Sequence, residues 1–175
     1  SSSQSSLATS MQRLSSGLRI NSAKDDAAGL AIAERMGAQV RGMNVAVRNA
    51  NDAISMSQTA EGALGKVGDM LQRMRELAVQ SANATNGSAD RDNLQAEYLQ
   101  LGEEITRTID TTKFNGLAVL SADAGALDFQ VGADSGDQVT ITTNDLSGGD
   151  IAAAVGETID GADNTASLAA IDAID

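Results

Sequence analysis

The stretch "MGAQVRGMNVAVRNANDAISMSQTAEGALGKVGDMLQRMRELAVQSA", residues 36–82, indicates the fold class of this chain. Its apolar residues recur at steps of three and four, the spacing of one helix face in a coiled coil. Two series show the spacing, with a six-residue offset between them: Val40, Met43, Val47, Ala50 and Ile54, then Ala60, Leu64, Val67, Leu71, Met74 and Ala78. We therefore predict one long helix.

A turn and a second helix follow. Asn86-Gly87 is typical of a turn, and Ser88 or Asp90 is a suitable N-cap for the helix after it. Leu94, Tyr98, Leu101 and Ile105 continue the helical spacing. The predicted fold is therefore mainly α, a long antiparallel coiled-coil-like helical hairpin over residues 36–110.

Beyond residue 112 the apolar period changes to two, which indicates β-structure. Alternation is seen at Leu117 and Val119 after the turn Asn115-Gly116, at Leu127, Phe129 and Val131, and at Val139 and Ile141. We expect a small β-hairpin element here. Residues 144–164 are rich in Gly and Asp and are predicted to be a loop, while residues 165–175 have the spacing of a helix.

A second apolar seam precedes the long helix and then stops. It consists of Leu7, Met11, Leu14 and Leu18. The polar stretch after it contains Asn21, Ser22, Asp25 and Asp26 and ends near Gly29. These short polar side chains compete for backbone hydrogen bonds, and glycine loosens a helix. We predict a break between two helical regions; a solvated helical kink is the alternative.

Composition excludes several classes of protein. The chain is 42% hydrophobic but only 2% aromatic, which favours thin helical seams, and it lacks Pro, which permits long helices. Without Cys or His it has no disulfide, thiolate or soft-metal site. It has no run of 18 apolar residues and no visible signal peptide.

Charge divides the chain into two parts. Residues 1–113 carry all 12 Lys and Arg and 13 of the 24 Asp and Glu, so residues 114–175 carry no basic residue and 11 acidic ones. A mixed surface suits packing against neighbours, whereas an acidic one suits water and repels nucleic acid and anionic lipid. Two ordinary solvated surfaces remain an alternative.

Catalytic patterns are poor. Gly62, Gly65, Lys66 and Gly68 lack the spacing of a phosphate-binding loop, and helix packing explains these glycines better. The acidic loops do not fit the twelve-residue calcium pattern, and no nucleophile has a His to activate it. We expect no enzyme activity, cofactor or metal.

Several blocks together resemble the N-terminal region of bacterial flagellin. They are "RLSSGLRINSAKDDAAG" (13–29), "RNANDAIS" (48–55), "QTAEGAL" (58–64), "RELAVQSANATN" (75–86), "KFNG" (113–116) and "FQVGA" (129–133). Residues 136–160 match poorly, as in the variable middle of the family. "ASLAAIDAID" (166–175) resembles the start of its C-terminal helical region.

The resemblance implies a domain organisation. Residues 1–20 would be part of the inner terminal helix of the filament core, and residues 21–36 the connector. Residues 37–143 would form the helical rod domain with its β element, followed by the variable acidic loop 144–164. Residues 165–175 would begin the C-terminal rod helix, and the chain would be truncated at both ends.

The resemblance also implies a function. Flagellin is an extracellular structural subunit that passes unfolded through the flagellar export machinery, assembles beneath a cap and polymerises into the filament used for swimming. The seam of Leu7, Met11, Leu14 and Leu18 would serve self-assembly. The absence of Cys suits export, since no disulfide can form prematurely. The partners expected are other flagellin subunits, the export machinery and the cap, with no nucleic acid and no membrane.

A host receptor is a further partner that the resemblance implies. Arg73, Leu77 and Gln80 share one ridge of the long helix, and an antiparallel partner helix would bring Glu97 near them. All four match residues in flagellins that the vertebrate flagellin-sensing Toll-like receptor detects. A packing surface between subunits is the alternative.

The main rival is a helical signalling or adaptor module, such as a chemoreceptor-like coiled coil. That class predicts uninterrupted seams and no β-structure. The alternating pattern in residues 113–142 counts against it.

Overall fold

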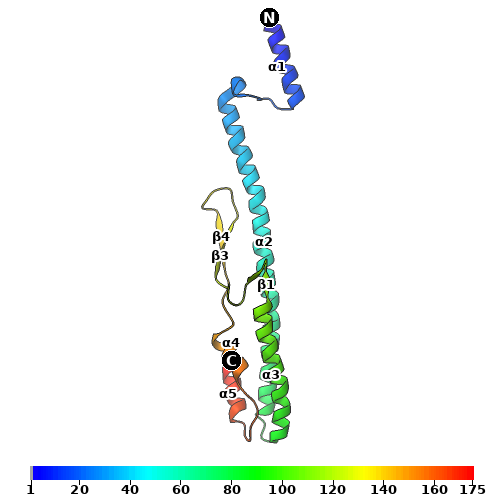
Figure 1. The fold of residues 1–175 in the computed structure, drawn as a ribbon, viewed down its shortest axis with the longest axis vertical. Helices are drawn as coiled ribbons and strands as arrows, with labels where there is room; N and C mark the ends of the chain where they lie inside the picture. The colour runs from blue at the N-terminus through cyan, green and yellow to red at the C-terminus, as the bar shows by residue number, and fades with distance from the viewer. Residues whose placement is uncertain (1) are drawn as a thin grey trace. The chain divides into compact units, whose positions relative to one another are not determined.

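The computed structural model describes residues 2–175, apart from the side chains of Ser2, Ser3, Ser5, Ala23, Lys24 and Asp25. It comprises two compact units, one of Ser1–Ala50 with Gln130–Gln138 and one of Asn51–Phe129 with Val139–Asp175. In chain order the elements are α1 (Ser2–Ser16), α2 (Ala23–Ser81), α3 (Ser88–Thr111), β1 (Lys113–Phe114), β2 (Leu117–Ala118), β3 (Ala126–Gln130), β4 (Gln138–Thr142), α4 (Gly149–Gly156) and α5 (Thr165–Ile174) (Figure 1). The mainly α fold class is confirmed.

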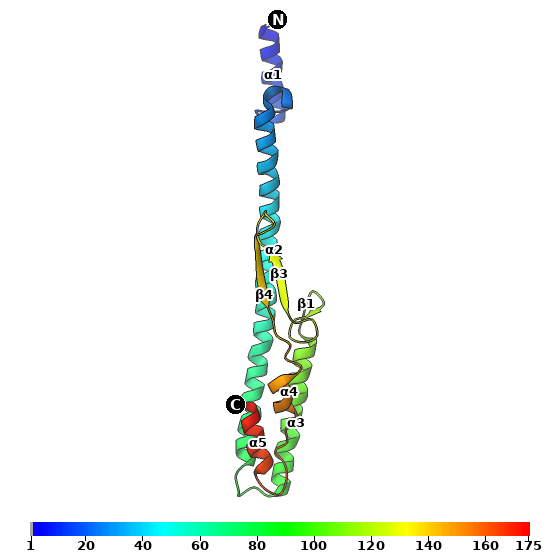
Figure 2. The same cartoon turned by 90° about the vertical axis from the view of Figure 1, so that its left-hand side faces the viewer.

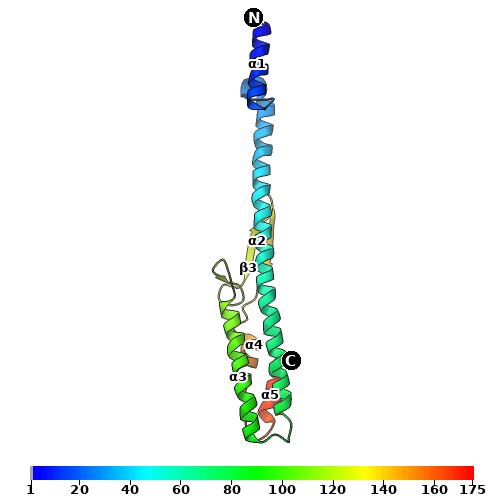
Figure 3. The same cartoon turned by 90° about the vertical axis from the view of Figure 1, so that its right-hand side faces the viewer.

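The second unit is built on the predicted helical hairpin. Within it, α3 runs antiparallel to the C-terminal part of α2, with α4 and α5 beside them (Figures 2 and 3). The prediction that Ser88 caps α3 is wrong, because Gly87 occupies that position and Ser88 is the first helical residue. Asp90 caps instead from the third helical position, where its carboxylate accepts the N–H of Gly87 at 3.1 Å.

The buried face of α2 differs from the predicted first series. Val40, Met43, Val47 and Ile54 are all exposed. The buried side chains continue one spacing of three, four and seven without any offset: Ala46, Ala53, Met56, Ala60, Ala63, Val67, Met74, Leu77 and Ser81. In the second series Ala60, Val67, Met74 and Ala78 are buried as expected, whereas Leu64 is exposed. In the range of the first series, the helix therefore buries Ala46 and Ala53 and exposes the larger apolar residues.

The core of the second unit joins α2 and α3 to the C-terminal segments. Its largest fully buried side chains include Tyr98, Met56, Met74, Ile105 and Ile109. Phe114, Leu127, Phe129 and Ile141 pack against this cluster from the β segments. The apolar faces of the helices and β segments, which contain few aromatic residues, thus pack together in the core of the second unit.

Glycines show which backbone approaches are close. A Cβ on Gly62, Gly65 or Gly68 would meet nothing within 4 Å, so these residues permit no close approach inside the described chain. A close approach between two helices occurs at Gly102 of α3, where a Cβ would lie 2.9 Å from Cγ1 of Val155 in α4. Gly102 therefore lets α4 lie directly on α3.

The β-structure consists of two two-stranded pairs. Strands β1 and β2 are antiparallel, with Lys113 opposite Ala118 and Phe114 opposite Leu117, and the turn Asn115-Gly116 has positive φ at both residues (48° and 87°). These angles suit a tight hairpin turn of Asn-Gly. β3 pairs with β4, and Val131 lies just beyond β3.

The prediction of a loop throughout residues 144–164 is wrong. Residues 149–156 form α4, because the apolar run "IAAAV" supplies one face that packs inward. Ala154 is buried, and Ile151 and Val155 pack against the core. The prediction of a helix in residues 165–175 is confirmed by α5.

In the first unit, the N-terminal helix ends earlier than its seam. Gly17 has φ +70° and donates its N–H to the carbonyl of Arg13 at 2.9 Å, the geometry of a glycine that ends a helix. Residues 17–22 are irregular, and α2 begins at Ala23. Leu18 therefore lies outside α1.

Candidate assembly and recognition surfaces

The predicted assembly seam is exposed. Leu7, Met11 and Leu14 on α1 and Leu18 just after it are 60–86% exposed. Fully burying such a side chain contributes roughly 1.5–3 kcal/mol. The seam is therefore an apolar stripe that a partner helix would cover favourably.

A second stripe follows the N-terminal half of α2. Ile32, Met36, Val40, Met43 and Val47 recur at steps of three and four and are 50–61% exposed. On the same part of the helix, Ala46 is buried, and a Cβ on Gly42 would lie 3.1 Å from the Cβ of Ala133. One face of this helix thus meets the loop between β3 and β4, while another presents large apolar side chains to solvent.

The predicted connector residues lie around the break and the start of α2. The side-chain amide of Asn21 donates to the carbonyl of Gln12 at 3.5 Å, and Ser22 is half-buried. Asp26 interrupts the helix with φ −165° and ψ 99°, and its carboxylate accepts the N–H of Gly29 at 2.8 Å. The side chain of Asp25 lies outside the described residues. Because the helix is otherwise continuous from residue 27, the irregular backbone is shorter than the predicted connector of residues 21–36.

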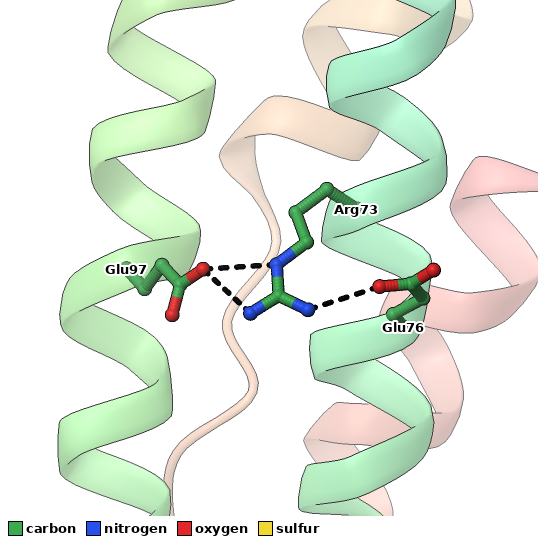
Figure 4. Close-up of polar contacts among 3 residues, drawn as sticks. All are labelled: Arg73, Glu76 and Glu97. Carbon is green, nitrogen blue, oxygen red and sulfur yellow. Dashed lines mark hydrogen bonds and ion pairs between the residues drawn. The ribbon is translucent and has the colours of Figure 1, made fainter.

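Arg73 links the two helices of the hairpin at their surface (Figure 4). Its guanidinium donates to Oε1 of Glu97 on α3 at 2.8 and 2.9 Å and to Oε2 of Glu76 at 2.9 Å. The hydrogen bonds to Glu76 and Glu97 raise the pKa of the guanidinium. Arg73 and Glu97 retain side-chain exposures of 46% and 48%, so the pair remains accessible.

The rest of the predicted recognition ridge is not continuous. Leu77 is only 1% exposed and belongs to the core cluster, so the expectation that it lies at the surface is wrong. It faces inward because its spacing from Met74 and Ser81 places it on the buried face. Gln80 is exposed. The structure thus brings Arg73 and Glu97 together and separates Leu77 from the surface.

Polar side chains on α3 capture the backbone of residues 154–161, which the sequence analysis missed. The hydroxyl of Tyr98 donates to the carbonyl of Ala154 at 2.7 Å, and Oε1 of Gln95 accepts the N–H of Ile159 at 2.6 Å. Arg91 donates to the carbonyls of Ser81 and Gly161 at 3.0 and 3.4 Å. Arg91, Gln95 and Tyr98 are spaced four and three residues apart, which would have placed them on one face of the helix. The sequence analysis did not assign that face to the core because two of the three side chains are polar.

Burial changes the acidity of one member of this set. It raises the pKa of Tyr98 to about 12, with a smaller contribution from the negative charge of Glu157. The hydroxyl therefore stays protonated as a donor at ordinary pH. Among the described residues, no three His, Cys, Asp or Glu are grouped to hold a metal ion.

Comparison with known proteins identifies the family. The model of the bacterial flagellin N-terminal helical region matches residues 1–124. The chain belongs to the bacterial flagellin family. It is 57% identical to a flagellin of Salmonella typhimurium over 139 residues. This alignment covers 79% of this chain and 28% of that protein. It is 53% identical to the polar flagellin B/D of Vibrio parahaemolyticus over 138 residues. This alignment covers 79% of this chain and 36% of that protein.

A solved structure supports the same assignment. The crystal structure of Bacillus cereus flagellin matches with a TM-score of 0.62 and 33% identity, covering 73% of this chain and 72% of that one. The chain spans about a third of the length of the curated relatives it matches. The family match and the strands of residues 113–142 count against the rival adaptor class, which predicts no β-structure. No described helix is long and apolar enough to cross a membrane.

Proposed function

We propose that this chain is part of a structural subunit of the bacterial flagellar filament, outside the cell, where copies polymerise for swimming. One observation carries the proposal. In a member of the flagellin family, the large apolar side chains of α1 and of the N-terminal half of α2 are exposed in regular helical stripes. Stripes of this kind suit helix packing within and between subunits.

The mode of assembly follows from the nature of such contacts. When a surface on one copy meets a different surface on the next, the contacts continue without closing and give an open helical polymer. The acidic residues of the segment 114–175 suit the outer surface. A chain without Cys can also be threaded unfolded through an export channel and assembled beneath a cap, since no disulfide forms on the way.

The test compares two pairs of aspartates in the protein at its natural length. Met43→Asp with Val47→Asp places charges in the α2 stripe, whereas Val79→Asp with Leu99→Asp places them at exposed apolar sites of the second unit that do not belong to the stripe. We expect the first pair to reduce filament mass in a pelleting assay at least tenfold and the second pair to leave filaments visible by electron microscopy. Equal filament yield from both pairs contradicts the proposal, as does a parent protein that forms no filaments.

We propose a second function, recognition of the monomer by the vertebrate flagellin-sensing Toll-like receptor. Support comes from the exposed Arg73 and Glu97, which match residues in flagellins that this receptor detects, and from the exposed Gln80. An arginine beside apolar surface is a common interface hot spot, costing about 2 kcal/mol or more when truncated. Leu77 would take part only through the helix geometry it supports.

A reporter-cell assay with monomeric protein tests this second function. We expect Arg73→Asp to lower potency at least tenfold with helical circular dichroism unchanged. Arg35→Asp, an exposed arginine elsewhere on α2, is the matched control and should retain potency. Equal potency of the Arg73 variant and the parent contradicts receptor recognition through this pair.

A further inference from the structure

A basic groove lies in the second unit between α2 and the C-terminal end of α3. It has a volume of about 520 Å³, and its lining includes Lys66 of α2, Arg107 of α3 and Lys113 of β1. None of the residues that line it, all of them within the described chain, is acidic. In a chain with a net charge of −12, three of the 12 basic residues therefore converge on one concave surface.

Two of these cations are available to a partner. Arg107 is held by Glu104 through a double ion pair, with Nε 2.7 Å from Oε2. The hydrogen bonds from Arg107 lower the pKa of Glu104, and the charge of Lys66 adds to this attraction. Neither Lys66 nor Lys113 forms an ion pair or hydrogen bond with another described residue. The groove thus presents two ammonium groups without a hydrogen-bonded partner among the described residues, and Lys66 also attracts the carboxylate of Glu104.

Two threonine hydroxyls of the groove are already used as hydrogen-bond donors. The hydroxyls of Thr59 and Thr111 donate their protons to the carbonyls of Ser55 and Arg107 at 2.8 and 2.7 Å. The positive charge that the groove offers to an anion therefore comes from its lysines. Gly62 keeps the α2 side open, since a Cβ there would meet nothing within 4 Å. A short acidic segment can enter such a groove.

The acidic part of the chain offers a matching segment, the loop of residues 133–137 between β3 and β4. Asp134 and Asp137 are both exposed, and the N–H of Asp134 donates to Oδ2 of Asp137 at 3.1 Å. The N–H of Val131 donates to the carbonyl of Asp137 at 2.8 Å, which also holds the loop in shape. A loop ordered in advance loses less entropy on binding.

We propose that the groove at Lys66 and Lys113 binds the acidic loop 133–137 of a second copy of this chain. Two aspartates three residues apart then face two lysines, and this complementarity selects one orientation of one copy against the next. The inference rests on the proposed filament function, because assembly of the filament is what would bring two copies together. It assigns one specific contact between them.

Charge exchange between copies of the whole chain tests the contact. One variant carries Lys66→Glu and Lys113→Glu, and the other carries Asp134→Lys and Asp137→Lys. We expect each alone to self-associate at least tenfold more weakly by analytical ultracentrifugation, because like charges then meet. A mixture of the two should regain association, since the reversed groove of one fits the reversed loop of the other. The control for net charge carries four glutamates on exposed neutral residues of α3 outside the groove, Ser88, Asn93, Ala96 and Gln100, and should associate like the parent.

Crosslinking identifies the residues in contact. A zero-length carbodiimide reagent applied to a mixture of ¹⁴N- and ¹⁵N-labelled parent chains should join Lys66 or Lys113 to Asp134 or Asp137 in mixed-isotope pairs. Links found only within one copy, failure of the mixture to regain association, or a parent without self-association would each overturn the proposal. If the parent and the groove variant both form filaments, the groove contact is contradicted and the filament function stands. If crosslinked pairs form but no filaments do, the filament function is contradicted and the groove contact stands.

Discussion

The two halves of α2 carry the same kind of apolar spacing and meet different surroundings. In residues 53–81 the helix buries Ala53, Met56, Val67 and Met74 within one core cluster or beside it. In residues 32–47 the large apolar side chains are exposed, although Ala46 is buried. The comparison teaches that helical spacing identifies a face of a helix, whereas the partner decides whether that face is a core or an available surface.

The largest expected difference is between truncating a side chain in the core and truncating one in the exposed stripe. Ile105→Ala, opposite the buried face of α2, should lower the free energy of unfolding by about 2–5 kcal/mol, because it leaves a cavity. Met43→Ala, in the exposed stripe, should change it by less than about 0.5 kcal/mol. Urea unfolding followed by circular dichroism measures both. Similar losses from the two variants would break the comparison.

Two glycine substitutions, with effects of intermediate size on stability, sharpen the comparison between crowded and open positions. Gly102→Ala should destabilise the protein by about 1–3 kcal/mol, because its Cβ would crowd Val155. Gly65→Ala, at an open helical position, should instead stabilise it by about 0.5–1 kcal/mol. Thermal unfolding of the two variants should therefore shift in opposite directions. A stabilising Gly102→Ala would show that α4 does not lie closely on α3.

The smallest effect concerns the hydroxyl of Tyr98. Tyr98→Phe should cost about 1 kcal/mol, because the carbonyl of Ala154 loses its donor. The pKa of Tyr98 is raised to about 12 in the folded chain, whereas an unfolded tyrosine ionises near its ordinary pKa of about 10. The stabilisation is therefore complete below pH 10 and is lost as the pH rises toward 12.

Unfolding measured between pH 8 and 12 checks this effect. The parent should lose stability above pH 10 more steeply than Tyr98→Phe, which lacks the ionisable group. Parallel profiles for the two proteins would place the hydroxyl outside the buried contact.

The candidate surfaces were only partly predictable. The spacing of Leu7, Met11 and Leu14 identified an exposed stripe, and the antiparallel hairpin correctly brought Arg73 near Glu97. Leu77 was misplaced because the ridge it shares with Arg73 lies at the edge of the buried face. Arg91 and Gln95 were missed because buried polar side chains that bind a backbone leave no apolar signal.

The sequence by itself determined the helical hairpin, the turn at Asn115-Gly116, the small β-structure and the flagellin resemblance, because these depend on local spacing, turn chemistry and contiguous motifs. Only the tertiary structure decided which face of α2 is buried and that residues 149–156 form a helix on α3. It also decided that Lys66 and Lys113 line one groove. These features depend on neighbours distant in the chain, since a side chain is buried or paired by what packs against it and not by its own spacing.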